Sequence, residues 1–388
     1  MNWTEYTLGE LLSYEQPTNY IVESTKYNDK FLTPVLTAGK TFILGYTNEK
    51  DGIYSDLPVI IFDDFTTASR YVNFPFKVKS SAMKILTPNI ELVIPKFIYY
   101  RMQAIQFDSS THKRYWIQQY SKIKVAVPPI LVQEQIVSRI EELFSKLDKG
   151  VETLQTIKQQ LAVYRQAVLQ EAFEGRLTGS ETKKQYGILG SFIEKPRYGT
   201  SKKCNYHRNK NSVAVYRIPN INYLEKRIDH SDLKYADFFE NELSNLTLKN
   251  NDILIVRSNG SVSLVGRAAL VKPIDVRGTF AGYLMRLRIL DTNIIEPKYI
   301  LYYLESIRAR TYIESKAKST SGVHNINSSE ICSLEIPIFS HVDQMKIVES
   351  IEMRLSTCAN IEQAVDEALT QADAMRQSIL RQAFEGEI

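Results

Sequence analysis

A stretch of the chain that occurs twice constrains the possible fold more than any other feature. The segment from Pro128 to Gly175 returns near the end of the chain as the segment from Pro337 to Gly386. Agreement is closest where the copies end, because both finish with Ala-Phe-Glu-Gly. The units of solenoid proteins recur roughly every 20 to 50 residues, which is a much shorter period. The repeat therefore predicts two large modules, each followed by the same connector.

Each copy of the connector is predicted to form a long helix. Its apolar residues recur mostly at alternating steps of four and three, the heptad pattern of a coiled-coil seam. Beyond the opening prolines, neither copy contains a proline that would break a helix. The residues that we expect in the seam are Ile136, Ile140, Leu147, Leu154 and Leu161 in the first copy and Ile347, Ile351, Val365, Met375 and Ile379 in the second.

The apolar stripe of each helix must be covered by another surface. The other copy is the nearest candidate. Packing of the copies side by side would set the small residues Ala368 and Ala372 against the large residues Ile157 and Leu161. In the alternative arrangement, each helix lies on its own module or on a partner protein. The shared heptad register favours the paired helices.

The segments outside the connectors are typical of mixed strands and helices. Short apolar runs broken by Gly, Pro and Asn predict strands and loops in the first module, with a helix from Pro95 to Gln106. The opening residues of the second module echo those of the first, so the modules resemble divergent copies. The predicted boundaries are a first module over 1–127, a connector helix over 128–178, a second module over 184–335 and a connector helix over 337–388.

Charge and cysteine content narrow the function classes. The 48 Lys and Arg residues against 44 Asp and Glu residues leave a net charge of +4, which permits a nucleic-acid partner if the positive charge is local. The 3 cysteines are far apart and no CxxC occurs, so neither a disulfide framework nor a zinc site is expected. The sequence contains no secretion signal and no apolar run of membrane-spanning length. We therefore expect a cytoplasmic protein.

Polar stretches in the second module are candidates for contact with nucleic acid. The run from Tyr198 to Lys203 leads into further cations, and the run from Arg257 to Ser261 follows a predicted strand. Arg, Ser and Asn side chains suit contacts with guanine, phosphate and adenine. A solvated loop is the alternative for the first run, and a plain hairpin turn at Asn259-Gly260 is the alternative for the second. The candidate contact residues are Tyr198, Gly199, Thr200, Ser201, Lys202, Lys203, Arg257, Ser258, Asn259, Gly260, Ser261, Asn325 and Asn327, the last of which also predicts a capping box with Glu330.

In the first module, basic residues alternate with aromatic ones. A strand-like stretch carries Lys77 and Lys79, and the stretch from His112 to Trp116 combines cations with rings that can stack on bases. A half-buried strand with a solvated face is the alternative for the first group. The candidate contact residues in this module are Lys77, Lys79, Lys113, Arg114 and Tyr115.

Residues for catalysis are hard to find in the sequence. Asp63 and Asp64 end a predicted buried strand and suggest a metal-dependent nuclease centre, but a turn or an internal hydrogen-bonding pair is the favoured alternative. The segment from Gly260 to Gly266 is not a phosphate-binding P-loop, and the 5 histidines do not form an HExxH motif. These absences favour a binding protein whose chemistry belongs to its partners.

The order of module, helix, module and helix resembles the specificity subunit of Type I restriction-modification systems. The resemblance depends on the Pro-Pro-x-x-x-Gln-x-x-Ile-Val start at residues 128–137 and on the Arg-Gln-x-x-Leu-x-x-Ala-Phe-Glu-Gly ends at residues 165–175 and 376–386. Phe62–Phe65, Phe74–Lys77 and Tyr198–Ser201 also look like segments of that family's target-recognition domains. Val132 departs from the family pattern, in which Glu often stands directly before the glutamine that is Gln133 here.

The resemblance implies two target-recognition domains of mixed α/β fold, related by a pseudo-twofold internal repeat, and long helices that form an antiparallel coiled coil. Each domain would read one half of a split sequence in double-stranded DNA. Two modification subunits would methylate adenine with S-adenosylmethionine, and motor or restriction subunits would use ATP and Mg²⁺, while this chain would bind no cofactor and catalyse no reaction. The alternatives are a stand-alone metal-dependent endonuclease and a coiled-coil scaffold without a DNA role.

Overall fold

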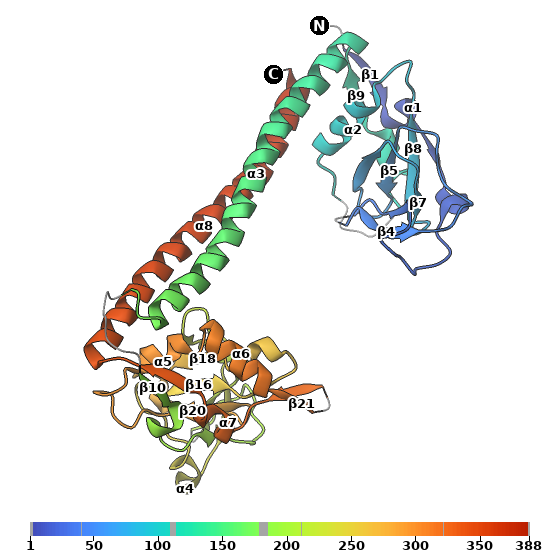
Figure 1. Cartoon of the computed structure of the whole chain (residues 1–388). Helices are drawn as coiled ribbons and strands as arrows, with labels where there is room; N and C mark the ends of the chain where they lie inside the picture. Colours follow the sequence, from blue (N-terminus) through green and yellow to red (C-terminus); the bar gives the residue numbers. More distant parts are fainter. Residues whose placement is uncertain are drawn as a thin grey trace. The chain divides into compact units, whose positions relative to one another are not determined.

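The computed structural model describes residues 3–39, 41–108, 114–177, 185–210, 212–320 and 322–386. They divide into unit 1, which is Met1–Gln155 with Asp366–Ile388, and unit 2, which is Thr156–Val365. The long helices α3 (Ile130–Phe173) and α8 (His341–Glu385) each begin in one unit and end in the other (Figure 1). In the ranges described, no helix has the length and apolar character needed to cross a membrane.

Unit 1 is a mixed α/β domain of short strands. Its described strands form an antiparallel pair β1-β9, an antiparallel sheet of order β2-β8-β5-β6 and a mixed sheet of order β4-β3-β7. The bounds are β1 (Thr4–Thr7), α1 (Leu8–Leu11), β2 (Leu12–Glu15), β3 (Thr33–Leu36), β4 (Ile43–Thr47), β5 (Val59–Asp63), β6 (Ser69–Val72), β7 (Lys77–Val78), β8 (Met83–Pro88), α2 (Pro95–Ala104) and β9 (Lys124–Val127).

Unit 2 has a similar plan, with a larger main sheet and one more small sheet among the described residues. Its described strands form an antiparallel pair β10-β23, a mixed sheet of order β11-β20-β16-β18-β14-β13, and smaller sheets of order β15-β12-β19 and β17-β22-β21. The bounds of its strands are β10 (Gln185–Ile188), β11 (Arg197–Tyr198), β12 (Ser212–Tyr216), β13 (Ile221–Asn222), β14 (Arg227–Ile228), β15 (Lys234–Asp237), β16 (Ile253–Val256), β17 (Ser258–Asn259), β18 (Ala268–Leu270), β19 (Thr279–Phe280), β20 (Leu284–Leu287), β21 (Lys318–Thr320), β22 (Val323–Asn325) and β23 (Glu335–Ile338). The helices are α4 (Glu240–Leu243), α5 (Pro297–Tyr303), α6 (Ile307–Lys316) and α7 (Ser328–Cys332), and a 3-10 turn, η5, covers Val262–Leu264.

Strands β5 and β16 lie at the centre of their sheets and are buried on both faces. Residues 59–62 and 253–255 are 0% exposed, and alternate side chains belong to different clusters of core residues. Successive side chains leave a strand on opposite faces, so a strand covered on both sides must be apolar throughout. Each strand leads directly into a polar segment, which starts at Asp63 in unit 1 and at Arg257 in unit 2. A rigid, buried strand therefore positions each of these polar segments.

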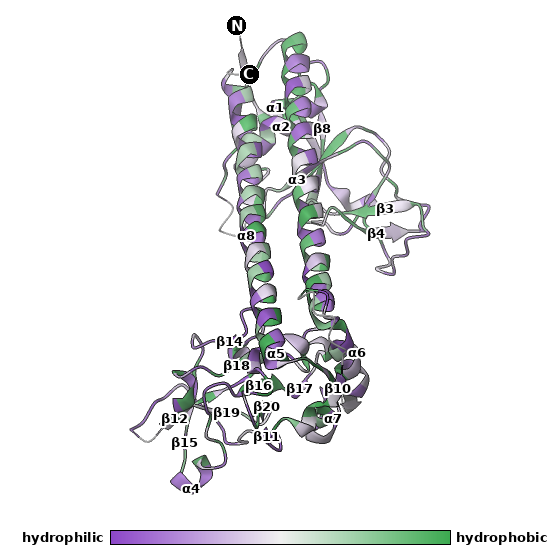
Figure 2. Ribbon diagram, turned by 60° about the vertical axis from the view of Figure 1, so that its left-hand side comes forward, coloured by the Kyte–Doolittle hydropathy of each residue, from purple (hydrophilic) through white to green (hydrophobic). Residues whose placement is uncertain are grey.

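Within each unit, α3 and α8 run antiparallel and side by side (Figure 2). In unit 1, Arg376 forms an ion pair with Asp148 and stacks over the Phe144 ring, with 4.3 Å between the guanidinium carbon and the ring centre. In unit 2, Arg165 pairs with Glu362 at 2.7 Å. Rising numbers on α3 meet falling numbers on α8, which confirms the antiparallel coiled coil.

Most of the predicted seam is covered, with one exception. Ile136, Ile140, Ile347, Ile351, Val365 and Ile379 are buried, and Leu147, Leu154 and Leu161 are half-buried. Met375 is 55% exposed, but it lines the same groove as the seam residues Leu147, Leu154 and Ile379. The opening turns of both helices also belong to the cores of the modules that precede them, so both arrangements considered from the sequence occur.

The antiparallel direction also corrects one expected set of neighbours. Ala368 and Ala372 line a groove in unit 1 with Leu147, Val151 and Leu154, and Ile157 and Leu161 are not part of its lining. Matching the copies residue by residue would hold for parallel helices, whereas the real pair runs in opposite directions.

The repeated glutamine makes the same contacts in both units. Gln133 is 0% exposed; its Oε1 accepts from Ile94 N at 2.8 Å, and its Nε2 donates to the carbonyls of Leu92 and Pro128 at 3.0 and 2.8 Å. Gln344, also 0% exposed, bonds in the same way to the main chain of Glu296, Ile294 and Phe339 at 3.0, 2.9 and 3.0 Å. Each amide therefore joins the start of a long helix to the segment before α2 or α5.

The ends of the helices are fixed by a second repeated set of contacts. The Phe384 ring of α8 packs on Phe97 of α2 at 5.4 Å, and the Phe173 ring of α3 packs on Tyr299 of α5 at 5.3 Å, both measured between ring centres. Each unit is thus held by the start of one long helix and the end of the other. This arrangement explains why both the starts and the ends of the connectors are repeated in the sequence.

Candidate nucleic-acid interface

Segments of unit 2 that are far apart in the sequence meet around the ring of Tyr198. The guanidinium carbon of Arg257 lies 4.4 Å from the ring centre, and Ser328 N donates to the Tyr198 hydroxyl at 2.9 Å. The guanidinium also donates to Gly282 O at 3.1 Å. Tyr198 is still 41% exposed. The stacked pair therefore presents a cation and a ring at the surface, held by residues of other segments.

The segment after β16 is held by another strand and is not a simple hairpin turn. Ser258 and Asn259 form β17, which pairs with β22 so that Ser258 lies opposite Asn325. Ile326 N also donates to Arg257 O at 2.9 Å. Gly260 and Ser261 follow as an exposed bend in which Ser261 N donates to Asn259 Oδ1 at 2.8 Å. The structure thus corrects the plain-turn alternative, because the residues before Gly260 belong to a three-stranded sheet.

Gly199 is required by the close approach of two chain segments. A Cβ at this position would collide with the carbonyl oxygens of Phe280 and Ala281. On either side of the contact, Thr200 N donates to Phe280 O at 2.8 Å and Gly282 N donates to Thr200 O at 2.7 Å. The main chain around Tyr198 is therefore locked to the segment that also accepts from Arg257.

The remaining candidates of unit 2 take different environments. Ser201 and Lys203 are exposed, whereas Lys202 pairs with Glu242 at 2.6 Å and lowers the pKa of that carboxyl by its hydrogen bond. Asn325 is half-buried and donates to Val323 O at 3.2 Å. Asn327 forms the predicted capping box with Glu330, and its side-chain oxygen accepts from Glu330 N at 2.9 Å. The charge of Lys202 and the oxygen of Asn327 are thus already used within the protein.

We name the surface formed by Tyr198, Gly199, Thr200, Arg257, Asn259 and Asn325 the Tyr198 cluster. Its members come from β11, the segment after β16, and β22. Ser258 is 4% exposed, and this burial corrects the prediction that its side chain contacts DNA directly. Sequence reasoning missed Tyr283, which is 62% exposed and whose carbonyl accepts from Arg257 N at 2.9 Å. An aromatic residue directly after a glycine at the start of a strand was the available signal.

Unit 1 gives a different result for its candidates. Lys77 is 4% exposed because its Nζ donates to Asp51 O at 2.7 Å and pairs with Glu49 at 3.0 Å. Tyr115 is 2% exposed, and its ring packs in the core against Phe107. Burial corrects the prediction that these two side chains contact DNA directly. Lys79 and Arg114 are exposed, and Lys113 lies outside the described residues.

The carboxylates of Asp63 and Asp64 serve the fold. Asp63 Oδ1 accepts from Phe65 N and Thr66 N, each at 2.9 Å, and so forms a turn. Asp64 is 2% exposed; it accepts from Trp116 N at 2.8 Å and pairs with Lys84 at 3.3 Å. Across the described ranges, no group of three or more His, Cys, Asp or Glu residues is placed to hold a metal ion. The turn and the internal pair predicted as the alternative account for both residues.

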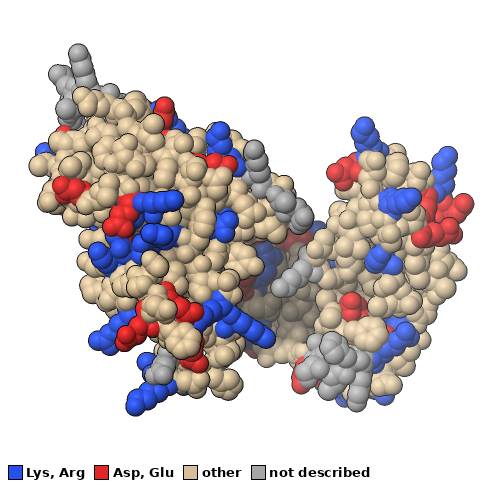
Figure 3. All heavy atoms as spheres, turned by 90° about the horizontal axis from the view of Figure 1, so that it is seen from below, with Lys and Arg blue, Asp and Glu red and all other residues tan. Residues whose placement is uncertain are grey.

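Positive charge does not gather into one broad patch on the face drawn in Figure 3. Lys and Arg side chains lie beside Asp and Glu side chains in both units. On this face, a contact with nucleic acid would depend on individually placed groups more than on a broad basic surface.

Comparison with known proteins gives a consistent picture. A family model described as the Type I restriction modification DNA specificity domain matches residues 1–162 and 182–371. The specificity subunit of the Type I restriction enzyme EcoR124I/EcoR124II from Escherichia coli is 32% identical over 389 residues, which cover 95% of this chain and 90% of that protein. The StySPI specificity subunit from Salmonella potsdam is 26% identical over 388 residues, covering 96% of this chain and 78% of that protein.

Solved structures share the fold. A chain from a study of complex assembly and conformational transition in a type I R-M system superposes with a TM-score of 0.72 and 16% identity, covering 100% of this chain and 98% of that chain. The HsdS subunit from Thermoanaerobacter tengcongensis gives a TM-score of 0.56 at 16% identity, covering 100% of this chain and 97% of that chain.

Proposed function

Because the chain belongs to the family of Type I restriction-modification DNA specificity subunits, we propose that it reads a bipartite sequence in double-stranded DNA, one half-site with each unit. Subunits of this family recognise DNA and leave catalysis to other chains. An unread spacer would separate the half-sites.

The Tyr198 cluster is the observation that carries this proposal. Arg257 is a residue type that forms paired hydrogen bonds with guanine in the major groove, whereas the side-chain oxygen of Asn259 already accepts from Ser261 N. The Tyr198 ring at 4.4 Å and the Gly282 carbonyl at 3.1 Å restrain the Arg257 side chain before DNA arrives. A restrained donor loses less conformational entropy on binding than a free one. These features support direct reading of bases by unit 2.

The length of the helices supports a spacer between the half-sites. Helix α3 has 44 residues without interruption. At about 1.5 Å per residue it is about 66 Å long, whereas one turn of DNA is about 34 to 36 Å. We infer that the paired helices set the number of unread base pairs.

The proposed partners supply the chemistry. Two modification subunits would bind S-adenosylmethionine and methylate adenine after flipping it from the helix, and motor or restriction subunits would use ATP and Mg²⁺ to move along and cut DNA. The exposed faces of α3 and α8, including Met375 at 55% exposure, offer surfaces for those subunits. Such an assembly would act on DNA in the cytoplasm.

Mapping of methylated adenines in cells tests the proposal. Cells that carry this chain and its modification subunit should show methylation at a motif of two short parts separated by a fixed number of unspecified bases, and cells without the chain should lack it. A continuous motif, or the same motif without the chain, would contradict the proposal. Cutting of DNA by the isolated chain with Mg²⁺ would favour the stand-alone nuclease.

A further inference from the structure

The segment that carries Arg257 to Ser261 belongs to a closed loop over residues 257–266. Its ends meet, since Val256 N donates to Arg267 O and Gly266 N donates to Val256 O, both at 2.8 Å. Between these ends, η5 turns the chain back under the exposed bend at Gly260 and Ser261. The conformation of this loop decides where the base-reading side chains point.

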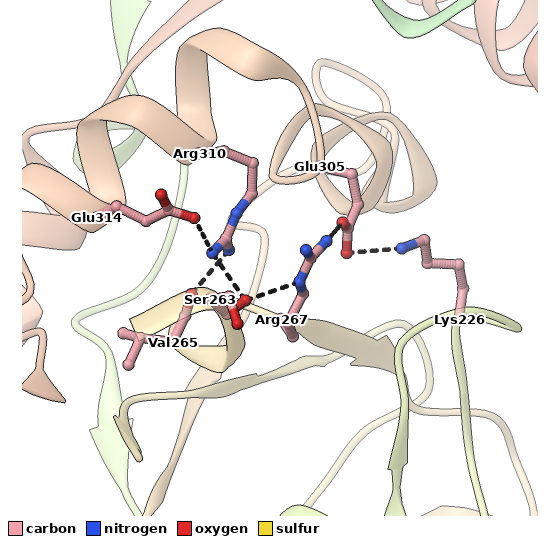
Figure 4. Close-up of polar contacts among 7 residues, drawn as sticks. All are labelled: Lys226, Ser263, Val265, Arg267, Glu305, Arg310 and Glu314. Carbon is pink, nitrogen blue, oxygen red and sulfur yellow. Dashed lines mark hydrogen bonds and ion pairs between the residues drawn. The ribbon is translucent and has the colours of Figure 1, made fainter. Parts of the chain in front are cut away.

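Arg310 on α6 holds this loop from beneath. Its side chain donates to Val265 O at 2.7 Å, to Ser263 O at 3.0 Å and to Glu314 at 2.9 Å (Figure 4). The residue is 9% exposed. A planar guanidinium can bond both carbonyls at once, which a lysine ammonium on its flexible stem does not reproduce.

A second arginine holds the same carbonyl from the other side. Arg267 Nε donates to Ser263 O at 3.0 Å, and its guanidinium pairs with Glu305. Glu305, 7% exposed, also pairs with Lys226 at 2.7 Å. Figure 4 shows these side chains pointing toward one another; Lys226 and Arg267 lie just before β14 and β18, and Glu305 lies between α5 and α6. The loop therefore rests on a connected set of charged groups.

Gly266 shows how closely the loop lies on α6. Its φ of +86° favours glycine, and a Cβ there would come within 2.9 Å of Arg310 Nη1 and within 2.8 Å of Ile313. Contact this close leaves no room for a larger residue at this position.

Stability by itself does not explain why this network of buried charged groups is present. Burying charged groups costs several kcal/mol per ion, and well-packed apolar residues often stabilise a fold as well or better. We propose that Arg310 is a positioning residue for DNA reading, which fixes the loop over residues 257–266 and so sets which base unit 2 selects. This inference rests on the proposed function.

The test compares the assembled complexes of wild type, Arg310→Met and Arg310→Lys with modification subunits, on DNA in which either half-site is scrambled. Both variants should lose discrimination at the half-site of unit 2 by about fivefold or more, the least expected for one base pair. Discrimination at the other half-site and the salt dependence of binding should stay as in wild type. Arg308→Met is the matched control, because Arg308 lies on the same helix with its side chain 55% exposed and pairs with Glu335.

Each outcome decides the inference. Variants with wild-type discrimination would overturn it, and so would an equal loss of affinity on cognate and scrambled DNA, which indicates a structural role only. If Arg310→Met does not fold, Arg310→Lys, which keeps the charge beside Glu314, supplies the same comparison. Wild-type complex that ignores both scrambled half-sites would instead disprove the proposed function.

Discussion

At the scale of single residues, the buried amides of Gln133 and Gln344 and the guanidinium of Arg257 make different kinds of contact. In Gln133 and Gln344, the amide nitrogen donates to two main-chain carbonyls and the amide oxygen accepts from one main-chain N–H of the same unit. Arg257 instead directs its guanidinium to a surface ring. The two glutamines therefore serve the fold, whereas Arg257 is the residue that we propose for recognition.

Replacement of Gln133 by Leu should destabilise unit 1. The change leaves Ile94 N and the carbonyls of Leu92 and Pro128 without their partner, and each buried group left unpaired costs about 1 to 3 kcal/mol. Thermal unfolding should show a lower melting temperature for Gln133→Leu. Gln135→Leu, at an exposed position two residues on, should melt as the wild type does; equal melting of both variants would show that the amide is dispensable.

Replacement of Arg257 by Ala should relax the reading of one half-site. The expected loss of discrimination is about 1 to 3 kcal/mol, as for removal of one paired contact with a base. Competition binding of the assembled complex, with cognate DNA against DNA scrambled at that half-site, measures it. Lys203→Ala, at an exposed position, should weaken both DNAs alike. An unchanged ratio for Arg257→Ala would remove this residue from the recognition surface.

At the scale of elements, the short helices α2 and α5 join the modules to the long helices. In α5, Tyr303 is 1% exposed and its hydroxyl donates to Glu335 O at 2.8 Å. Burial raises the pKa of Tyr303 to about 12. An unfolded tyrosine loses its proton near pH 10, so the stabilising effect is complete below that pH and is lost as pH rises toward 12.

This shift predicts an alkaline loss of stability to which Tyr303 contributes. The melting temperature of the wild type should fall between about pH 10 and pH 12, and Tyr303→Phe should fall less steeply. At pH 7 the variant should be less stable by about 1 kcal/mol, because one buried hydrogen bond is missing. Tyr283→Phe, with a ring 62% exposed, is the control and should keep the wild-type slope. Identical slopes for all three proteins would contradict the assignment.

At the scale of the whole molecule, α3 and α8 are the segments through which the chain passes between its units. The units divide after Gln155 in α3 and after Val365 in α8. Added residues at these points leave the contacts described above within each unit in place.

Insertion of one heptad at both points should lengthen the unread spacer. Seven residues add about 10.5 Å of helix, which equals about three base pairs of DNA. Mapping of methylated adenines should show the same two half-sites further apart. Insertion into one copy alone should prevent methylation, since the two paired helices would then differ in length by one heptad. A spacer that stays the same after the double insertion would show that the helices do not set it.

Several structural features could be predicted from the sequence, and others could not. The heptad pattern predicted both long helices, and the Asn327 to Glu330 spacing predicted the capping box, because each depends on neighbours a few residues apart. The heptad pattern did not predict the exposure of Met375, because it does not show that the neighbouring Arg376 packs onto Phe144. The sequence did not show that Lys77 and Tyr115 are buried, because the residues that they contact, Asp51 and Phe107, lie in other segments of the chain.

By itself, the sequence determined the internal repeat, the connector helices and the resemblance to the specificity family, since periodicity and local motifs are written along the chain. Only the tertiary structure decided which polar stretches form a surface. Arg257 stacks on a ring 59 positions away in the numbering and follows a strand that pairs with β22, and no local pattern specifies such meetings. Burial and pairing depend on segments distant in the chain, which is why the Tyr198 cluster and its support by Arg310 emerge only from the fold.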